Sequence, residues 1–315
     1  MSMSKRWVDW AVKLHAQTAQ AAGAVYVDGI RSVTLNPGLQ SSLEASDGSP
    51  YATFASLTAG APTGSFETTD LKALLDECSA FMAIDDDGTH PGIEFFLQSM
   101  AQGGTRSTGS AIKLTIGNGI LALSSLELSH QAPAVLSAEV TARKDGVTAP
   151  LAVATGETLP ATVYPATSVI WSLGKVVFNG TEIDGLESVS IEFGIEVEAE
   201  AADGDVYPTF AMVRQIRPTI TLKGVHVDLL STLSVDGAFY TASQVVIYAR
   251  KRAEGGTYVA DATAEHVSFT LGKCRVDPGS IDGDPKSISL TLSPYYTAGG
   301  SPVLPITINT ATAIA

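Results

Sequence analysis

The sequence DGLESVSIEFGIEVEAEAADGDVYPTFA, residues 184–211, alternates apolar and polar side chains over most of its first half. The apolar set is Val189, Ile191, Phe193, Ile195 and Val197, and the polar set is Ser190, Glu192, Gly194, Glu196, Glu198 and Glu200. A period of two predicts a half-buried β-strand over Leu186–Glu200. Asp203-Gly204 then predicts a hairpin turn, and Tyr207–Arg214 the returning strand. Because typical strands have about 5 to 6 residues, we expect so long a hairpin to project from its domain or to bend.

The same pattern occurs earlier in the chain, as DGIRSVTLNPGLQSSLEASDGSPYATFA at residues 28–55, an offset of 156 positions (184 − 28). The alignment needs no gap from Asp28 to Thr63, and it places Asp47-Gly48 at the equivalent turn. Looser matches continue, such as AIKLTIG (111–117) with HVSFTLG (266–272). The later match has an offset of 155 (266 − 111), and nearly equal offsets over such distances indicate that a whole structural unit is duplicated.

The pattern predicts a mainly β fold with two tandem β-sandwich or barrel domains, each with a long hairpin and one short flanking α-helix. The helices are expected at Thr69–Phe81, with Thr69 as the N-cap, and at Val225–Leu233. The expected divisions are an N-terminal arm or helix at 1–23, a first copy at 24–144, a linker at 145–167, a second copy at 168–297 and a C-terminal tail or edge strand at 298–315.

Composition restricts the classes of function. The formal net charge of −14 argues against a basic groove for nucleic acid, since phosphate binding depends on Lys and Arg. The sequence has no run of about 18 apolar residues, so we expect no membrane-spanning helix. The N-terminus lacks the apolar core of a signal peptide. The two cysteines, Cys78 and Cys274, are expected to be buried free thiols in a reducing compartment.

Residues that would carry catalysis are not grouped in the sequence. The five histidines are scattered, and no nucleophile elbow, zinc-protease or phosphate-loop motif occurs. Asp85–Gly88 lacks the spacing of a calcium loop and is interpreted as a solvated acidic loop. We therefore expect neither an enzyme nor a cofactor or metal site.

A resemblance follows from these residues. Two copies of a strand leading into a polar turn, SVTLNPGL (32–39) with SDGSPYATF (46–54) and SVSIEFGI (188–195) with ADGDVYPTF (202–210), together with a helix at TTDLKALLD (68–76), resemble the tail tube proteins of long-tailed bacteriophages. The resemblance is architectural and covers almost the whole chain. The unequal charge of the two copies departs from it, because the equivalents of Glu192, Glu196 and Glu198 are uncharged in the first copy.

The resemblance implies a structural virion protein in which three duplicated chains form a pseudo-hexameric ring, and stacked rings form the channel for DNA. The residues then expected to line the channel are Asn36, Gln40, Ser42, Glu44, Glu192, Glu196, Glu198 and Glu200. The hairpin tips expected to contact other subunits or rings are Asp47, Gly48, Ser49, Pro50, Asp203, Gly204, Asp205 and Val206. Implied partners are further copies, a tape-measure protein, tail-terminator and tail-tip proteins, and double-stranded DNA that passes without specific binding. The implied location is the virion tail, after assembly in the host bacterial cytoplasm.

Two other interpretations stay open. A baseplate or tail-tip hub protein would use the same duplicated domains in one trimeric ring per virion. A β-sandwich decoration or receptor-binding protein would form discrete oligomers with exposed aromatic loops.

Overall fold

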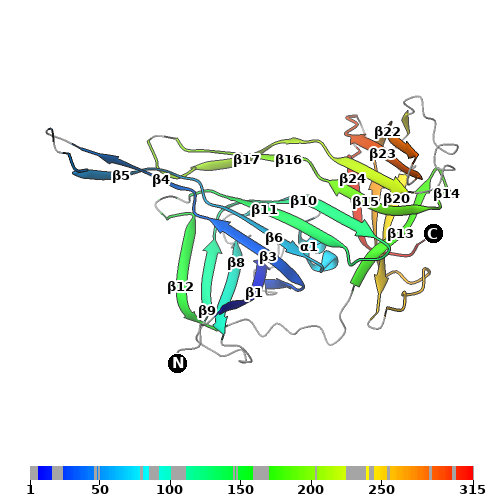
Figure 1. Cartoon of the computed structure of the whole chain (residues 1–315), viewed down its shortest axis with the longest axis horizontal. Coiled ribbons are helices and arrows are strands. Elements are labelled where there is room, and N and C mark those ends of the chain that lie inside the picture. Colours follow the sequence, from blue (N-terminus) through cyan, green and yellow to red (C-terminus); the bar gives the residue numbers. More distant parts are fainter. Residues whose placement is uncertain are drawn as a thin grey trace.

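The computed structural model describes residues 6–15, 24–45, 48, 50–78, 81–84, 92–100, 111–144, 146, 148–158, 170–202, 204–224, 239–240, 245–253, 256–283, 286–299 and 303–314. Over these residues the chain is mainly β, as predicted, and its paired strands run antiparallel (Figure 1). No helix in the described part is long and apolar enough to cross a membrane.

The elements divide into two series. The first contains β1 (Arg6–His15), β2 (Ala24–Val27), β3 (Ile30–Asn36), β4 (Leu39–Glu44), β5 (Phe54–Gly60), β6 (Thr63–Thr68), α1 (Leu71–Glu77), β7 (Phe81–Ile84), β8 (Ile93–Met100), β9 (Ala111–Ile116), β10 (Gly119–Ser129), β11 (Val135–Ala142) and β12 (Leu151–Glu157). The second contains β13 (Ile170–Phe178), β14 (Thr181–Glu182), β15 (Leu186–Glu192), β16 (Ile195–Glu200), β17 (Phe210–Ile216), β18 (Thr219–Gly224), β19 (Phe239–Tyr240), β20 (Val245–Arg252), β21 (His266–Leu271), β22 (Lys273–Gly283), β23 (Lys286–Tyr295) and β24 (Ile306–Thr312).

The strands of the two series pair in the same order. The order β12-β9-β8-β1-β2 in one sheet recurs as β24-β21-β20-β13-β14 in another, and β3-β6-β11-β10 recurs as β15-β18-β23-β22. Each described strand thus has its equivalent twelve places later. The bulge between Leu123 and Ser125 in β10 recurs between Pro278 and Ile281 in β22. We call β1 to β12 with α1 repeat 1, and β13 to β24 repeat 2.

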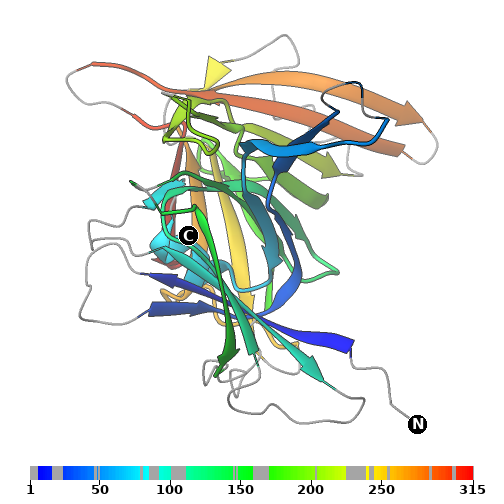
Figure 2. The ribbon, with the colours of Figure 1, turned by 90° about the vertical axis from the view of Figure 1, so that its left-hand side faces the viewer.

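The repeats are joined through one continuous sheet. Its order is β19-β22-β23-β18-β15-β10-β11-β6-β3, with β7 beside β10, so the last strand of one set pairs with the first strand of the other. We call this β10·β15 pairing the central junction. In Figure 2 the sheet of β1, β8, β9 and β12 lies at the opposite end of the molecule from β22 and β23.

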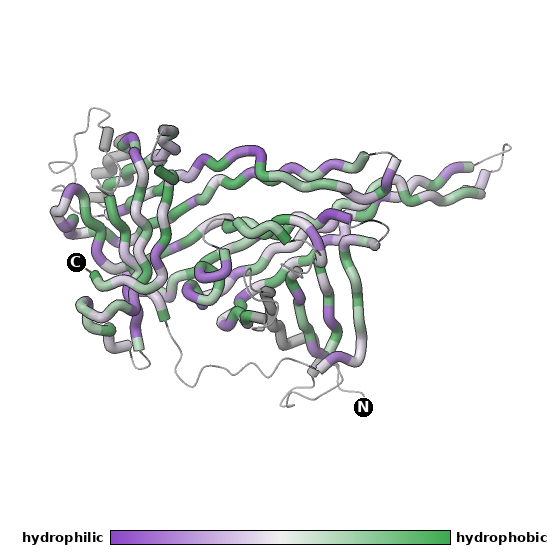
Figure 3. Tube along the Cα trace, turned by 180° about the vertical axis from the view of Figure 1, so that it is seen from behind, coloured by the Kyte–Doolittle hydropathy of each residue, from purple (hydrophilic) through white to green (hydrophobic). Residues whose placement is uncertain are grey.

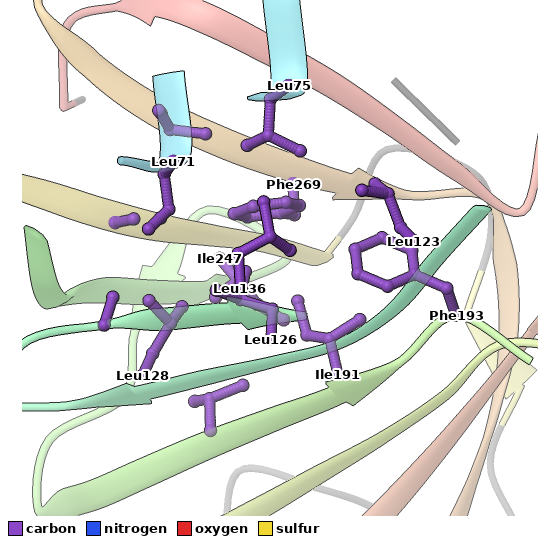
Figure 4. Close-up of a cluster of buried hydrophobic side chains, with 14 of the residues drawn as sticks. Leu71, Leu75, Leu123, Leu126, Leu128, Leu136, Ile191, Phe193, Ile247 and Phe269 are labelled. Carbon is purple, nitrogen blue, oxygen red and sulfur yellow. The ribbon is translucent and has the colours of Figure 1, made fainter. Parts of the chain in front are cut away.

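The hydrophobic core also crosses from one repeat to the other. Figure 4 shows Leu71 and Leu75 of α1 in the same cluster as Leu126 of β10, Ile247 of β20 and Phe269 of β21. All five side chains are almost fully buried. Because helix and sheet belong to different repeats, neither repeat buries its apolar face alone.

Truncating Leu126 tests this shared core. Leu126→Ala removes a fully buried side chain and is expected to lower the free energy of unfolding by about 2–5 kcal/mol. Chemical unfolding should show one cooperative transition, shifted as a whole. Val153→Ala, at a side chain that is 62% exposed, should change stability by at most about 0.5 kcal/mol. Two separate transitions, only one of them shifted, would show that the repeats unfold independently.

The stretch 1–23 was expected to be an N-terminal arm or helix, and its described residues 6–15 form a strand, β1, rather than a helix. The register of β1 with β8 fixes its place in a sheet. Strand β12 lies inside the stretch expected as a linker. In 298–315, expected as a C-terminal tail or edge strand, β24 is the edge strand of its sheet. The domain boundaries themselves stay a prediction.

Helix α1 lies within the range predicted for it, but its cap differs from the expected Thr69. Asp70 is the N-cap, and its side chain accepts a hydrogen bond from the Ala73 amide at 3.3 Å. Burial raises the pKa of Asp70, against the lowering effect of its backbone donors. The helix expected at Val225–Leu233 lies outside the described residues.

The long strand expected in each copy is bent into two. Between β3 and β4, and again between β15 and β16, a glycine with positive φ turns the chain: Gly38 at +60° and Gly194 at +57°. A Cβ at these sites would lie 2.1 Å from the Ala61 carbonyl oxygen and 2.0 Å from that of Arg217, so only glycine fits. Beyond each bend a separate two-stranded hairpin leaves the sheet (Figure 1). We call β4–β5 arm 1 and β16–β17 arm 2.

Candidate functional site

At the central junction, strand β10 of repeat 1 is covered by strand β15 of repeat 2. Its register pairs Leu126 with Ile191 and Glu127 with Ser190, and the Ser190 hydroxyl donates to Glu127 Oε1 at 2.6 Å. Beyond the last pair, the Phe193 amide donates to the Ser124 carbonyl at 3.0 Å. Backbone and side chains together therefore bind repeat 2 to repeat 1 in one fixed register.

We call the sheet that joins the two repeats the long sheet. Toward its two outer ends lie β22 and β3, the equivalents of the two strands that pair at the central junction, and there each lacks that partner. In the described part of the chain, β3, the equivalent of β15, pairs only with β6. Strand β22, the equivalent of β10, has β19 against Cys274 and Arg275, while no described strand pairs with that side of Ile281–Gly283. An unpaired edge offers backbone donors and acceptors to another strand.

Burial differs between equivalent residues in the way a missing neighbour would produce. Val189 and Ile191 of β15 are 0% exposed at the central junction. Their equivalents on β3, Val33 and Leu35, are only partly buried. The β3 edge therefore has the side chains of a covered strand but lacks the cover.

One face of the long sheet is lined mainly by serine, threonine and carboxylate side chains. They come from consecutive strands of both repeats and include Thr34, Asn36, Ser65, Ser137, Glu139, Glu127, Ser190, Glu192, Thr221 and Thr291. Part of this face forms a shallow hollow between Asn36, Thr63 and Glu139. The opposite face holds the core, so this polar face is available to solvent or to a polar partner.

Two of the residues predicted to line a channel lie on this polar sheet face, at equivalent places. Asn36 ends β3 and Glu192 ends β15, and both are exposed. Burial raises the pKa of Glu192, and the charge of nearby Glu127 raises it further. Acidification that protonates Glu192 therefore relieves a like-charge repulsion at the central junction.

The other six predicted channel residues lie on the arms rather than in the long sheet. Gln40, Ser42 and Glu44 share one face of arm 1, and Glu196, Glu198 and Glu200 share the equivalent face of arm 2. Figure 3 shows polar and apolar residues along both arms. Arg214 partly neutralises arm 2, with Nη1 3.4 Å from Glu198 Oε2.

Among the predicted tip residues, those of arm 2 make contacts inside the chain. Asp205 Oδ1 lies 2.5 Å from Lys144 Nζ, and the Val206 carbonyl accepts from the Gly60 amide at 2.8 Å. The tip of arm 2 is thus attached to repeat 1. Gly204, Gly48 and Pro50 are exposed, and Asp47, Ser49 and Asp203 lie outside the described residues.

Other groups with chemical potential have structural roles where they are described. His266 is buried, with Nδ1 accepting from the Lys251 amide at 3.1 Å and Nε2 near the Ala260 carbonyl oxygen at 3.1 Å. Among the described residues no three His, Cys, Asp or Glu side chains gather as metal ligands would. The acidic loop Asp85–Gly88 lies outside the described part.

The two cysteines are buried free thiols, as predicted. Burial raises the pKa of Cys78 to about 12, with a smaller contribution from the charge of Glu77, and that of Cys274 to about 11. At pH 8 we therefore expect native protein to react very slowly with Ellman's reagent, and the denatured chain to release two equivalents. A single exposed Thr34→Cys should react at once, as a control. The folded pKa values of the two thiols lie above those of the unfolded chain. Their contribution to the free energy of unfolding is therefore complete below about pH 9 and is lost as the pH rises toward 11–12. Rapid reaction of both native thiols would contradict this placement.

The unpaired strand edges and the aromatic pair Tyr295-Tyr296 were missed by sequence reasoning. Which strand ends a sheet depends on long-range pairing, and no local pattern marks it. The tyrosines are 42% and 53% exposed, and they stand where repeat 1 has Arg143-Lys144, because β23 and β11 pair with β18 and β6 in the same register. Aligning the strand ends of the two copies would have revealed this exchange of cations for aromatics.

Comparison with known proteins identifies no relative: no protein-family model matches the chain, and no curated protein matches it.

Proposed function

We propose that this chain is a structural protein that associates head to tail with its own copies into closed rings, and that stacked rings form a tail tube through which viral DNA passes. The observation that supports this most is the central junction. One strand edge of repeat 1 already pairs with an edge of repeat 2, and the same two edge types stand unpaired at the ends of the long sheet.

The junction supplies a template for contact between chains. If β22 of one copy pairs with β3 of the next as β10 pairs with β15, each chain adds two equivalent units to a continuous sheet. Such a head-to-tail contact is heterologous, and it closes into a ring when the rotation per unit divides a full turn. Three chains with two repeats each give the pseudo-sixfold ring that the sequence resemblance implies.

Surface chemistry supports a passage for DNA rather than a site that binds it. The polar face of the long sheet has hydroxyl and carboxylate groups, and the outward face of arm 2 adds Glu196, Glu198 and Glu200. DNA has one negative charge per about 1.7 Å of helix axis. A wall of this composition repels the phosphates, so DNA slides with its counterions instead of being held.

Electron microscopy of the purified protein tests the proposal. Long hollow tubes built from repeated rings are the expected result. Single rings that never stack would favour the hub interpretation. Monomers or discrete particles without a central channel, at the highest soluble concentration, would overturn the proposal and favour a decoration or receptor-binding protein.

Reversing the charge of arm 2 tests the role of the channel wall. The triple variant Glu196→Lys, Glu198→Lys and Glu200→Lys is expected to form tubes but to slow DNA ejection from assembled particles, because lysines on the wall bind phosphate. The isosteric variant with glutamine at the same three positions is the control, and it should eject DNA at nearly the normal rate. Normal kinetics in the lysine variant would remove these residues from the channel.

A further inference from the structure

Arm 2 is attached to repeat 1 at two levels. Along its length, β16 and β17 lie over β10, and β16 also contacts β11 (Figure 1). Ile195 faces a hollow that Ala122 and Glu139 help to line. At its tip, the Gly60 amide donates to the Val206 carbonyl at 2.8 Å and the Lys144 amide to the Pro208 carbonyl at 2.7 Å. The Lys144–Asp205 ion pair closes the contact.

Arm 1 has the same construction, but no repeat precedes it in the chain. Its strand register and bulge match those of arm 2 position by position, so Leu39, Leu43 and Leu57 are equivalent to Ile195, Ala199 and Val213. The three residues of arm 2 are partly buried. Those of arm 1 are 57%, 72% and 40% exposed. One face of arm 1 is thus a row of leucines without a cover.

We propose that arm 1 docks on a second copy of this chain, lying across β22–β23 with its tip against Tyr295 and Tyr296. The proposal rests on the head-to-tail association proposed above, and it names the surface that each arm meets. The equivalence is fixed by strand register: β22 and β23 stand where β10 and β11 stand under arm 2, and Tyr296 stands where Lys144 does.

The chemistry of the docking surface changes in a way that fits arm 1. The sequence counterparts of Asp205 and Val206 are Ser49 and Pro50, so arm 1 has no carboxylate at the position that pairs with Lys144 in arm 2. Its target offers Tyr295 and Tyr296 instead of Arg143 and Lys144, and the nearby Ile216, 39% exposed, instead of Gly60. Aromatic rings with a polar end are frequent at protein interfaces.

The surface of β22 that would lie under arm 1, between its tip and its bend, also differs from the surface under arm 2. Arg275 and Asp277 stand where Ile120 and Ala122 lie under arm 2, and they pair with each other at 2.8 Å between Nη2 and Oδ1. Arg275 and Asp277 therefore balance each other's charge in this part of β22.

The two docking surfaces discriminate between the arms. Placed on repeat 2, the tip of arm 2 would set the Asp205 carboxylate against tyrosine rings, with Lys144 lost as a partner. Placed on repeat 1, arm 1 would offer Lys144 the hydroxyl group of Ser49 in place of the Asp205 carboxylate. The exchange of charge for aromatic surface therefore favours alternation of the two repeats around a ring.

A pair of cysteines tests the docking. Pro208 and Lys144 are joined by a backbone hydrogen bond in arm 2 docking, and their equivalents are Ala52 and Tyr296. The variant Ala52→Cys with Tyr296→Cys is expected to form a disulfide between chains under mild oxidation, visible as covalent multimers on a non-reducing gel. The matched control, Ala52→Cys with Lys144→Cys, offers the same thiol at the site that arm 2 already occupies, and should not cross-link.

The outcomes separate this inference from the proposed function. A second cysteine pair, Thr34→Cys with Asp282→Cys, reports whether β3 of one copy pairs with β22 of the next. Cross-linking at Lys144, a disulfide within one chain, or no cross-link at Tyr296 in protein that still forms the β3–β22 cross-link, would overturn arm docking and leave head-to-tail association intact. Loss of both the Ala52–Tyr296 cross-link and the cross-link between β3 and β22 would overturn arm docking and head-to-tail association together. A variant with Leu39, Leu43 and Leu57 all changed to serine gives a second measurement: it keeps the arm but removes its apolar face, and should weaken association at least about tenfold. Unchanged association would contradict the inference.

Discussion

Val33→Lys is expected to abolish association between copies while leaving the chain folded. Val33 is partly buried on the open edge of β3, so a lysine there can extend its ammonium group into solvent in the monomer. Its equivalent at the central junction, Val189, is 0% exposed. Edge pairing would therefore bury the lysine charge, at a cost of several kcal/mol, and a loss of about 3 kcal/mol is already more than 100-fold in affinity. Sedimentation velocity measures the result directly.

The neighbouring residue provides the control for this substitution. Thr34→Lys adds the same side chain to the same strand, but on the polar face of the sheet, where pairing buries nothing apolar. Association should persist in this variant, and circular dichroism should show both proteins folded. Wild-type association of Val33→Lys, or equal loss in the two variants, would show that β3 is not the contact edge.

Thr34→Cys combined with Asp282→Cys is expected to join copies covalently in nearly complete yield. The central junction pairs Glu127 with Ser190, and register assigns Asp282 and Thr34 as the equivalents on β22 and β3. Directly opposed residues of antiparallel strands have Cα atoms about 4.5–5.5 Å apart, within the range that a disulfide spans. Oxidation should give a ladder on a non-reducing gel that ends at the ring size, a trimer under the proposed function.

An off-register pair is the control for the cross-link. Val33→Cys with Asp282→Cys places the two thiols on opposite faces of the sheet, so the yield should fall sharply. The native cysteines do not interfere, because burial holds the pKa of both thiols far above the pH of the experiment. Equal yields from the two pairs, or no covalent multimer from Thr34 and Asp282, would contradict the predicted register.

The different surroundings of arm 1 and arm 2 explain why the two copies differ in sequence although they agree in strand order. Contacts that repeat 1 makes with repeat 2 form within one chain, as the polypeptide folds. In the proposed ring, contacts at the outer edges would form only when chains meet, so they would need surfaces that are stable when exposed. Under the proposed association, Tyr295, Tyr296 and the open β3 edge are such surfaces, whereas the ionic Lys144–Asp205 contact lies within one chain.

Sequence by itself determined the mainly β class, the duplication, the hairpins and the buried state of both cysteines. These features depend on local periodicity, turn residues and composition, which act within a few residues of chain. It did not predict a strand at Arg6–His15 or at β12, which lies in the expected linker. The expected projection or bend of each long hairpin occurs at Gly38 and Gly194, and β24 has the edge-strand form that was one of the two expected for 298–315.

Only the tertiary structure decided which strands pair across the repeats, which edges stay open and which arm is covered. These depend on residues more than a hundred positions apart coming together, as Leu71 and Leu75 do with Ile247 and Phe269 in one buried cluster (Figure 4). Equivalent side chains, Val33 and Val189 among them, have the same local pattern and differ only in what the rest of the chain places beside them. Burial is a property of the neighbour as much as of the residue, and for this reason the open β3 edge could not be found in the sequence alone.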